Sequence, residues 1–219
     1  MTTPGDPFAL THWRRTVAEM YAVVRGAPAA EQARAWEAFR TARDALFQSH
    51  PQTPLTTQQR VRFSGIAYYP YDPAWRIVGA LDRDVERETL AVELPAEGLF
   101  HYTRVARVRF RARGRDAALS VFWIEGYGGG LFLPFRDASN GSETYGGGRY
   151  LYDSIKGADL GTGTGDESAS WTGMHQVVLD FNYAYNPSCA YNEQWVCPLA
   201  PVENWLSFPV EAGEKAFEV

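Results

Sequence analysis

The segments that decide the fold are His101–Ala112, HYTRVARVRFRA, and Ala117–Gly126, AALSVFWIEG. In the first segment, from Arg107 onward, arginines alternate with apolar residues. This period of two is typical of a strand with one solvated face. Between the two segments, Gly114–Asp116 has the composition of a turn. Together they predict two consecutive strands of an antiparallel sheet.

Strand-like patterning continues on both sides of this pair. The further candidates are VRFSGIAYY (61–69), WRIVGAL (75–81), TLAVEL (89–94), GLFLPFRD (130–137), RYLYDSI (149–155) and MHQVVLDF (174–181). Short strands joined by short turns predict antiparallel meanders that close into a β barrel or sandwich. Residues 157–173 are rich in Gly, Ser, Thr and Asp, and we expect them to form an exposed, mobile loop.

A pair of amphipathic α-helices is predicted within residues 9–50, ahead of the strands. The first has Thr11 as its N-cap and ends at Gly26–Pro28, and the second ends at His50-Pro51. The apolar stripes of the two helices are Trp13, Val17, Met20, Tyr21 and Val24, and then Trp36, Phe39, Ala42, Leu46 and Phe47. In the second helix Glu37, Arg40, Arg43 and Asp44 are expected to face away from the stripe. The fold class is therefore mainly β (α+β), with residues 1–219 as a single domain and its β part in 61–219.

Composition and charge exclude some classes of binding partner. The 219 residues carry a formal net charge of -5, which gives no overall attraction to nucleic acid or to anionic lipid. The arginines from Arg104 to Arg115 are interpreted as one solvated face of a strand. No apolar run approaches the ~20 residues of a membrane-spanning helix, and the N-terminal residues do not resemble a secretory signal. We expect a cytoplasmic protein that binds neither nucleic acid nor a membrane.

The segment Asp180–Leu206, DFNYAYNPSCAYNEQWVCPLAPVENWL, begins as a strand and then loses any apolar period. It keeps aromatics, prolines and asparagines, which is the wrong composition for disorder. We expect a long ordered loop, which is either the wall of a ligand site or a structural lid fixed by its own side chains. Its candidate ligand-binding residues are Asp180, Asn182, Tyr185, Asn186, Cys189, Tyr191, Cys197 and Asn204.

A second candidate segment is TYGGGRYL, residues 144–151. The N–H groups around Gly147 and Gly148 could form an anion-binding concavity. Arg149 would then contact a carboxylate or phosphate, with Tyr145 and Tyr150 completing the pocket. The alternative is a hairpin turn with Arg149 paired internally; the candidate partners are Asp137, Asp180 and Glu214.

Cys189 and Cys197 have a spacing that matches no familiar metal or redox motif, and the histidines are scattered, so no metal site is predicted. Three interpretations stay open for the pair: a disulfide, buried free thiols, or a reactive nucleophile. For Cys189 to act as a nucleophile, a nearby base or cation must lower its pKa. The candidates for that role are His175, Arg149 and Lys215.

Several motifs together resemble the bacterial and archaeal family catalogued as domain of unknown function 1684. They are FRTARDALFQSHPQTPL (39–55), YYPYDP (68–73), LFLPFRD (131–137), TYGGGRYL, the Asp180–Leu206 segment and AGEK (212–215). The resemblance extends from about Trp36 to Phe217, and it implies no activity.

The leading functional hypothesis is a small-ligand-binding β domain whose partner is a small anionic molecule received by Arg149. The first alternative is a hydrolytic or thiol-dependent enzyme that uses Asp180, His175 or Cys189. The second is a structural or partner-binding domain without a ligand. The sequence specifies no cofactor and no oligomeric state.

Overall fold

The structure, a computed structural model, describes residues 6–94, 98–162 and 176–218. Its centre is a seven-stranded antiparallel sheet with the order β6-β5-β4-β3-β1-β7, in which β2 also pairs with β3. The strands are β1 (Arg76–Asp82), β2 (Thr89–Leu94), β3 (Gly98–Ala112), β4 (Arg115–Ile124), β5 (Gly130–Phe135), β6 (Arg149–Asp153) and β7 (Gln176–Asp180).

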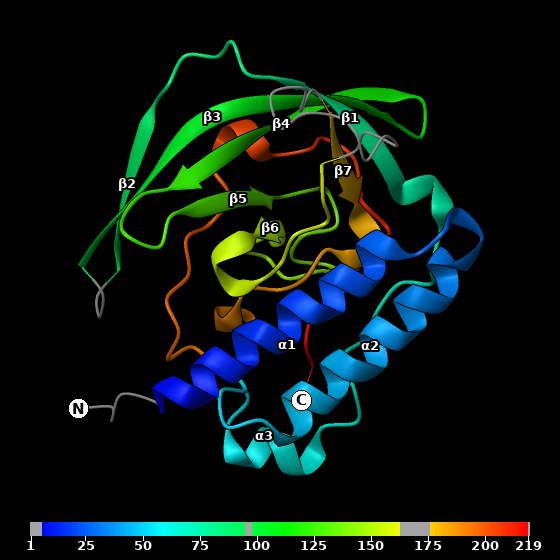
Figure 1. The fold of residues 1–219 in the computed structure, drawn as a ribbon, viewed down its shortest axis with the longest axis vertical. Coiled ribbons are helices and arrows are strands. Elements are labelled where there is room, and N and C mark those ends of the chain that lie inside the picture. The colour runs from blue at the N-terminus through cyan, green and yellow to red at the C-terminus, as the bar shows by residue number, and fades with distance from the viewer. Residues whose placement is uncertain (1–5, 95–97, 163–175, 219) are drawn as a thin grey trace.

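The long strand β3 shapes the sheet. It pairs with β4 from Tyr102 to Ala112, while its other edge pairs first with β2 and then with β1. The register with β4 shifts between Arg104 and Ala106, and such a bulge bends a strand and increases its twist. The sheet curls into a half-barrel (Figure 1), which confirms the prediction of a mainly antiparallel β fold with N-terminal helices.

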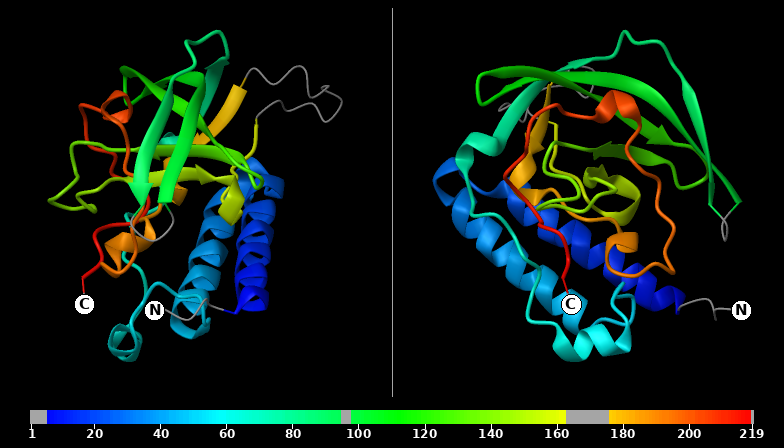
Figure 2. Two further views of the ribbon diagram at one scale, coloured as in Figure 1. Left: turned by 90° about the vertical axis from the view of Figure 1, so that its left-hand side faces the viewer. Right: turned by 180° about the vertical axis from the view of Figure 1, so that it is seen from behind.

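The helices are α1 (Pro7–Gly26), α2 (Gln32–Ser49) and α3 (Thr57–Arg62). Short 3₁₀ turns occupy Ala29–Glu31, Pro73–Trp75, Ser154–Lys156, Phe181–Tyr183, Ser188–Ala190 and Val202–Asn204. The helices α1 and α2 lie side by side on one side of the half-barrel (Figure 2). One hydrophobic cluster joins Tyr21 of α1 and Phe39 of α2 to Phe181 and Tyr183, which follow β7. The helical and β parts therefore share a core.

Two local predictions are wrong. The helix α1 is capped by Asp6, whose side chain accepts from Phe8 N, and not by Thr11, which lies inside the helix. Residues 61–69 are not a strand. A reciprocal capping box between Thr56 and Gln59 begins α3, which includes residues 61 and 62, and residues 63–69 are irregular apart from the isolated bridge between Tyr68 and Glu214.

The remaining strand candidates coincide with β1 to β7, and α2 ends at Ser49 as predicted. The loop predicted for residues 157–173 lies mostly outside the described residues, which resume at Gln176. No helix in the described ranges is both long and apolar enough to cross a membrane.

The arginines along β3 and its turn lie beside carboxylates. The pairs are Arg104 with Glu88 and Glu203, Arg107 with Glu203, Arg109 with Asp82, Arg111 with Asp116, and Arg113 with Asp72. Most of these arginines are solvated, but the side chain of Arg104 is only 14% exposed. The positive charge of this strand is therefore largely compensated by its neighbours.

Removing the Phe39 ring tests the shared core. Its centroid lies 5.1 Å from that of Tyr21 and 4.9 Å from that of Tyr183. We expect Phe39→Ala to lower the free energy of unfolding by about 3–5 kcal/mol and the helical and β signals to unfold in one transition. Urea denaturation followed by circular dichroism and tryptophan fluorescence measures both. Val61→Ala, at an exposed position, is the control, with a change within about 0.5 kcal/mol. Separate helix and sheet transitions would contradict a common core.

Candidate ligand-binding site

The chain after β7 forms the wall of the site and also ties the molecule together. It runs along the open side of the half-barrel towards α3 (Figure 2). Isolated β-bridges join Tyr185 to Tyr150, Trp205 to Arg136 and Glu214 to Tyr68. The segment Asp180–Leu206 is thus attached to the sheet at both ends of its course.

Arg149, the predicted anion receptor, is fully buried and internally paired. Its Nη2 donates to Asp137 Oδ2 at 2.8 Å and to the Val210 carbonyl, and its Nη1 donates to the carbonyls of Ala212 and Glu214. The anion-receptor hypothesis is therefore corrected: with 0% exposure and these partners, the guanidinium serves the internal alternative. Of the three partners considered, Asp137 is the one that forms the ion pair.

The triple glycine forms a turn. Gly148 has a φ of +93° and donates its N–H to the Tyr145 carbonyl, and a Cβ on Gly147 would collide with the Tyr145 ring. Neither glycine lines a cavity with Arg149, so the predicted concavity is also corrected. Close packing accounts for these glycines.

Two buried asparagines fix the loop to the rest of the molecule. Asn204 bonds to both N–H and carbonyl of Ser120 and to the carbonyl of Pro134. The side chain of Asn182 bonds in the same reciprocal way to the backbone N–H and carbonyl of Asp72. The backbone carbonyl of Asn182 accepts a hydrogen bond from the Trp36 indole. These two predicted ligand-binding residues are occupied by backbone partners, as the structural-lid interpretation requires.

A buried carboxylate holds the loop against α2. Glu214 is 0% exposed, and its Oε1 accepts from Arg43 Nε at 2.5 Å and from the Tyr68 hydroxyl at 3.1 Å. Its Oε2 accepts from the Asn186 N–H at 2.7 Å and from the Tyr191 hydroxyl at 2.6 Å. Arg43 was expected to face away from the apolar stripe of α2, yet it is 8% exposed. The four donors of Glu214 make its charge tolerable in the interior.

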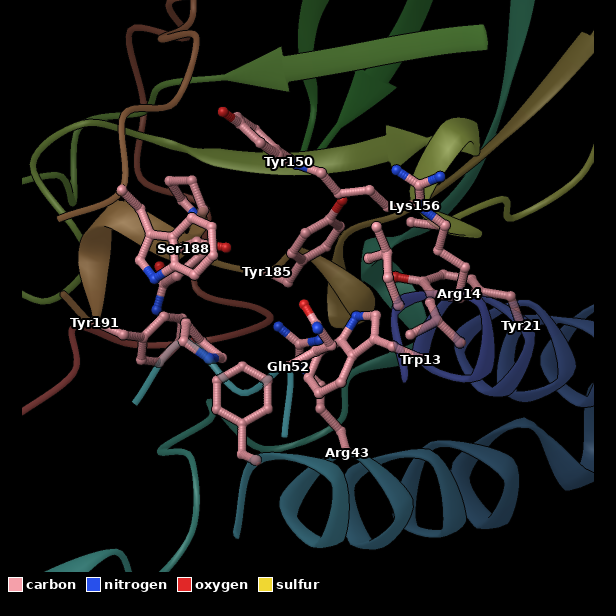
Figure 3. Close-up of a pocket in the computed structure, with 18 residues that line it drawn as sticks. Trp13, Arg14, Tyr21, Arg43, Gln52, Tyr150, Lys156, Tyr185, Ser188 and Tyr191 are labelled. Atoms are coloured by element: carbon pink, nitrogen blue, oxygen red, sulfur yellow. The ribbon is translucent and has the colours of Figure 1, made fainter. Parts of the chain in front are cut away.

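Beside this carboxylate lies a cavity of about 370 Å³. It is enclosed by α1, α2, Tyr150 of β6, the turn that follows β6, and the loop from Tyr185 onward (Figure 3). Its aromatic walls are Trp13, Tyr21, Phe47, Tyr150, Tyr185, Tyr191 and Trp195. A concave, mostly apolar site with a few polar groups is the usual form of a small-molecule site.

The charged side chains that line the cavity are all cationic. Arg14, Arg43 and Lys156 line it, and none of the described residues that line it is acidic. Arg43 donates Nε to Glu214, while its Nη groups donate to no described residue. Lys156 lies 3.2 Å from Asp153, and Arg14 forms no ion pair within the described ranges. The guanidinium groups of Arg14 and Arg43 therefore have donors available to a ligand.

Two residues that line the cavity also carry a buried polar atom without a partner in the described chain. The Tyr185 hydroxyl and Asn186 Oδ1 are buried and accept or donate no hydrogen bond within the described chain. Burial raises the pKa of Tyr185 well above its usual value, so the hydroxyl stays a donor. Buried polar groups of native proteins are nearly always satisfied by protein, water or ligand.

The predicted site residues thus divide into two groups. The structure brings Tyr150, Tyr185, Asn186 and Tyr191 together around the cavity. It places Asp180, Asn182, Asn204, Gly147, Gly148 and Arg149 elsewhere, in packing and hydrogen-bonding roles. Tyr145, Cys189 and Cys197 form a separate cluster, and His175 lies outside the described residues.

The sequence analysis missed the contribution of the helices to this site. Trp13 was assigned to a packing stripe and Arg43 to the face away from one, and Arg14 was given no role, whereas all three line the cavity. One signal was present: Arg43 stands four residues after Phe39 and four before Phe47, so it falls within the buried stripe of α2.

With this geometry established, comparison with known proteins defines the class. Residues 61–215 match the model of a family described as protein of unknown function (DUF1684). The chain belongs to that family, as its motifs indicated.

A solved relative has the same fold. The solution structure of an uncharacterised protein from Haloarcula marismortui matches with a TM-score of 0.59 and 31% sequence identity, covering 82% of this chain and 91% of the other. No curated protein matches the chain. The comparisons therefore give the family and the fold.

The Arg149–Asp137 pair yields a stability prediction. Arg149→Met leaves the Asp137 charge and three carbonyls without the guanidinium, and we expect a loss of about 3–5 kcal/mol in the free energy of unfolding. Arg109→Met removes the exposed pair with Asp82 and is expected to cost less than about 1 kcal/mol. Urea denaturation of both variants makes the comparison. Equal losses would show that Arg149 does not have the structural role described.

Asp180 yields a pH prediction. Burial raises its pKa from 3.8 to about 6, although Asn182 and Arg76 partly oppose the shift, and its Oδ2 accepts no hydrogen bond from the described chain. The folded protein binds this proton more tightly than the unfolded chain does. Its contribution to stability is therefore full below about pH 4 and is lost as the pH rises through about 6.

Asp180→Asn, which cannot ionise, removes that dependence. From pH 4 to pH 7 we expect the variant to gain up to about 3 kcal/mol relative to the wild type, since one pKa unit corresponds to about 1.36 kcal/mol. Unfolding curves at both pH values measure the gain, with the exposed Asp116→Asn as control. Parallel pH profiles of wild type and Asp180→Asn would contradict a buried, partly protonated Asp180.

Proposed function

We propose that this protein is a small-ligand-binding domain whose ligand occupies the cavity between α1, α2 and the loop after Tyr185. The observation that carries the proposal is a cavity wall with aromatic side chains and three cationic side chains but no acidic one among the described residues. The ligand is an anion with a flat apolar body. The proposal keeps the anionic ligand expected from the sequence and assigns its recognition to different arginines.

The three cationic side chains lie at different depths in the cavity. Arg43 lies at the floor, with its guanidinium over the rings of Phe47 and Tyr185 at 4.8 and 5.2 Å. Arg14 and Lys156 are exposed, so they lie where the cavity meets solvent. If the anionic group of the ligand lies near Arg14 and Lys156, the apolar body of the ligand packs against Trp13, Tyr150 and Tyr191 (Figure 3).

Hydrogen bonding defines a further requirement. The Tyr185 hydroxyl offers a donor and Asn186 Oδ1 offers an acceptor. A ligand whose hydroxyl or amide reaches these buried atoms would satisfy both of them, and a purely hydrocarbon body would leave them unpaired. Sites of this kind discriminate strongly against analogues that lack the polar group.

A matched pair of probes tests the charge preference. We expect 2-naphthoate to quench the fluorescence of Trp13 and Trp195, which line the cavity, and to bind more tightly than the uncharged 2-naphthylmethanol. Arg14→Gln and Lys156→Gln should each weaken naphthoate binding by about 2–10-fold, as expected for partly solvated charge contacts. Neither variant should change the affinity of the alcohol.

Arg15→Gln is the matched control, since Arg15 neighbours Arg14 on α1 but does not line the cavity. Equal affinities for the two probes would refute the anion preference and leave the cavity as an apolar site. If neither probe binds at millimolar concentration, the binding proposal itself fails.

A further inference from the structure

Outside the cavity, the two cysteines of the chain interact through their side chains, although seven residues separate them in the sequence. Both are free thiols of intermediate exposure. The Tyr145 hydroxyl donates to Cys189 Sγ at 3.5 Å, and Cys197 is the side chain with the largest effect on the pKa of Cys189. Cys189 therefore lies beside a phenol and interacts with a second thiol.

The two thiols differ in access. Cys189 lines an open hollow of about 620 Å³, together with Tyr145, Tyr191 and the residues Thr56, Gln59 and Arg62 at α3. Cys197 does not line this hollow. A reagent that enters from solvent thus reaches the sulfur of Cys189 first.

We propose that Cys189 and Cys197 form a peroxide-oxidisable dithiol, in which Cys189 is the reacting thiol and Cys197 closes an intrachain disulfide. This inference does not depend on the proposed ligand cavity. It selects between interpretations of the cysteines that the sequence left open, and it requires a hydroperoxide as oxidant.

The electronic environment supports this assignment of roles. The hydrogen bond from Cys197 is the largest cause of a lowered pKa of Cys189, about 6, and the Tyr145 hydroxyl and the charge of Lys156 act in the same direction. The pKa of Cys197 is raised by Cys189 and by burial. At neutral pH Cys189 is the thiolate and Cys197 keeps its proton. The cation that helps to lower the pKa of Cys189 is Lys156. Two of the candidates expected from the sequence have other partners: Arg149 pairs with Asp137, and Lys215 pairs with Glu143.

The reaction balances in two steps. The Cys189 thiolate attacks one oxygen of the hydroperoxide, so an S–O bond forms, the O–O bond breaks, and the alkoxide or hydroxide leaving group takes up a proton. Cys197 then attacks the sulfenic sulfur, forming the S–S bond and releasing the oxygen as water. Two thiols lose two electrons and two protons, and the hydroperoxide is reduced to an alcohol, or to water when it is hydrogen peroxide, with one further water released.

The test uses the full chain, which has no other cysteine. Reduced protein is treated with one equivalent of hydrogen peroxide, then denatured, alkylated and weighed by mass spectrometry. We expect the wild type to lose two hydrogens and both alkylation sites. In Cys197→Ser, dimedone should trap a sulfenic acid on Cys189, whereas Cys189→Ser should give no adduct under the same conditions.

The pH profile of alkylation tests the roles of the neighbours. We expect the rate at Cys189 to rise with a midpoint near pH 6, and the midpoint to move upward in Cys197→Ala and in Tyr145→Phe, which remove hydrogen-bond donors. Tyr145 is a positioning residue, and a purely structural role would leave the midpoint unchanged in a folded variant. Thermal unfolding of each variant confirms that it is folded.

A labelling experiment on the wild-type protein tests the proposal without any variant. Cleavage after Glu193, which stands between the two cysteines, separates them for mass analysis after partial alkylation at pH 6.5. Preferential labelling of Cys189 supports the proposal. Labelling of Cys197 first, or two free thiols remaining after peroxide, would overturn it.

Discussion

The carboxylate of Glu214 is the constraint on which the rest of the structure depends. It stands near the C-terminus, yet it receives hydrogen bonds from Arg43 of α2, from Tyr68 after α3, and from Asn186 and Tyr191 of the long loop. Three other segments of the chain thus converge on one buried charge near its end. Because removal of one partner of a buried charge is far more costly than loss of an exposed contact, these segments are held in a single arrangement.

A second buried charge completes this framework. Arg149 at the start of β6 binds the carbonyls of Val210, Ala212 and Glu214 and the carboxylate of Asp137. The last residues of the chain therefore lie between two arginines, one on the helical side and one on the sheet. The cavity lies beside Arg43, where the helices, the loop, β6 and the turn after it surround a space that their side chains do not fill. The loop after β7 is both a structural lid and a cavity wall, so the two interpretations of its sequence were not exclusive.

The sequence predicted what depends on local periodicity and missed what depends on distant partners. The alternation in His101–Ala112 identified β3, and the helical stripes identified α1 and α2, because one buried face imposes its period on neighbouring residues. The strand-like composition of residues 61–69 was misleading, because its first two residues belong to α3, which the Thr56–Gln59 capping box begins, and the rest is irregular chain bridged at Tyr68 to the distant Glu214. Arg149 could be assigned either to an anion or to an internal partner, since only the fold brings Asp137 and the C-terminal carbonyls to it. Arg43 was misplaced for the same reason: its partner Glu214 is 171 residues away.

The cavity and the hollow at Cys189 share one lining residue. Tyr191 lines both hollows, and its hydroxyl is fixed by Glu214 at 2.6 Å. Its ring packs on Phe47 of α2, with centroids 4.9 Å apart, and equally closely on Phe217. A side chain anchored at its polar end and along its ring has little freedom to move, so Tyr191 is a fixed part of both walls. The remaining lining differs, because helices α1 and α2 contribute to the cavity and α3 contributes to the hollow at Cys189, and each hollow therefore has its own chemical character.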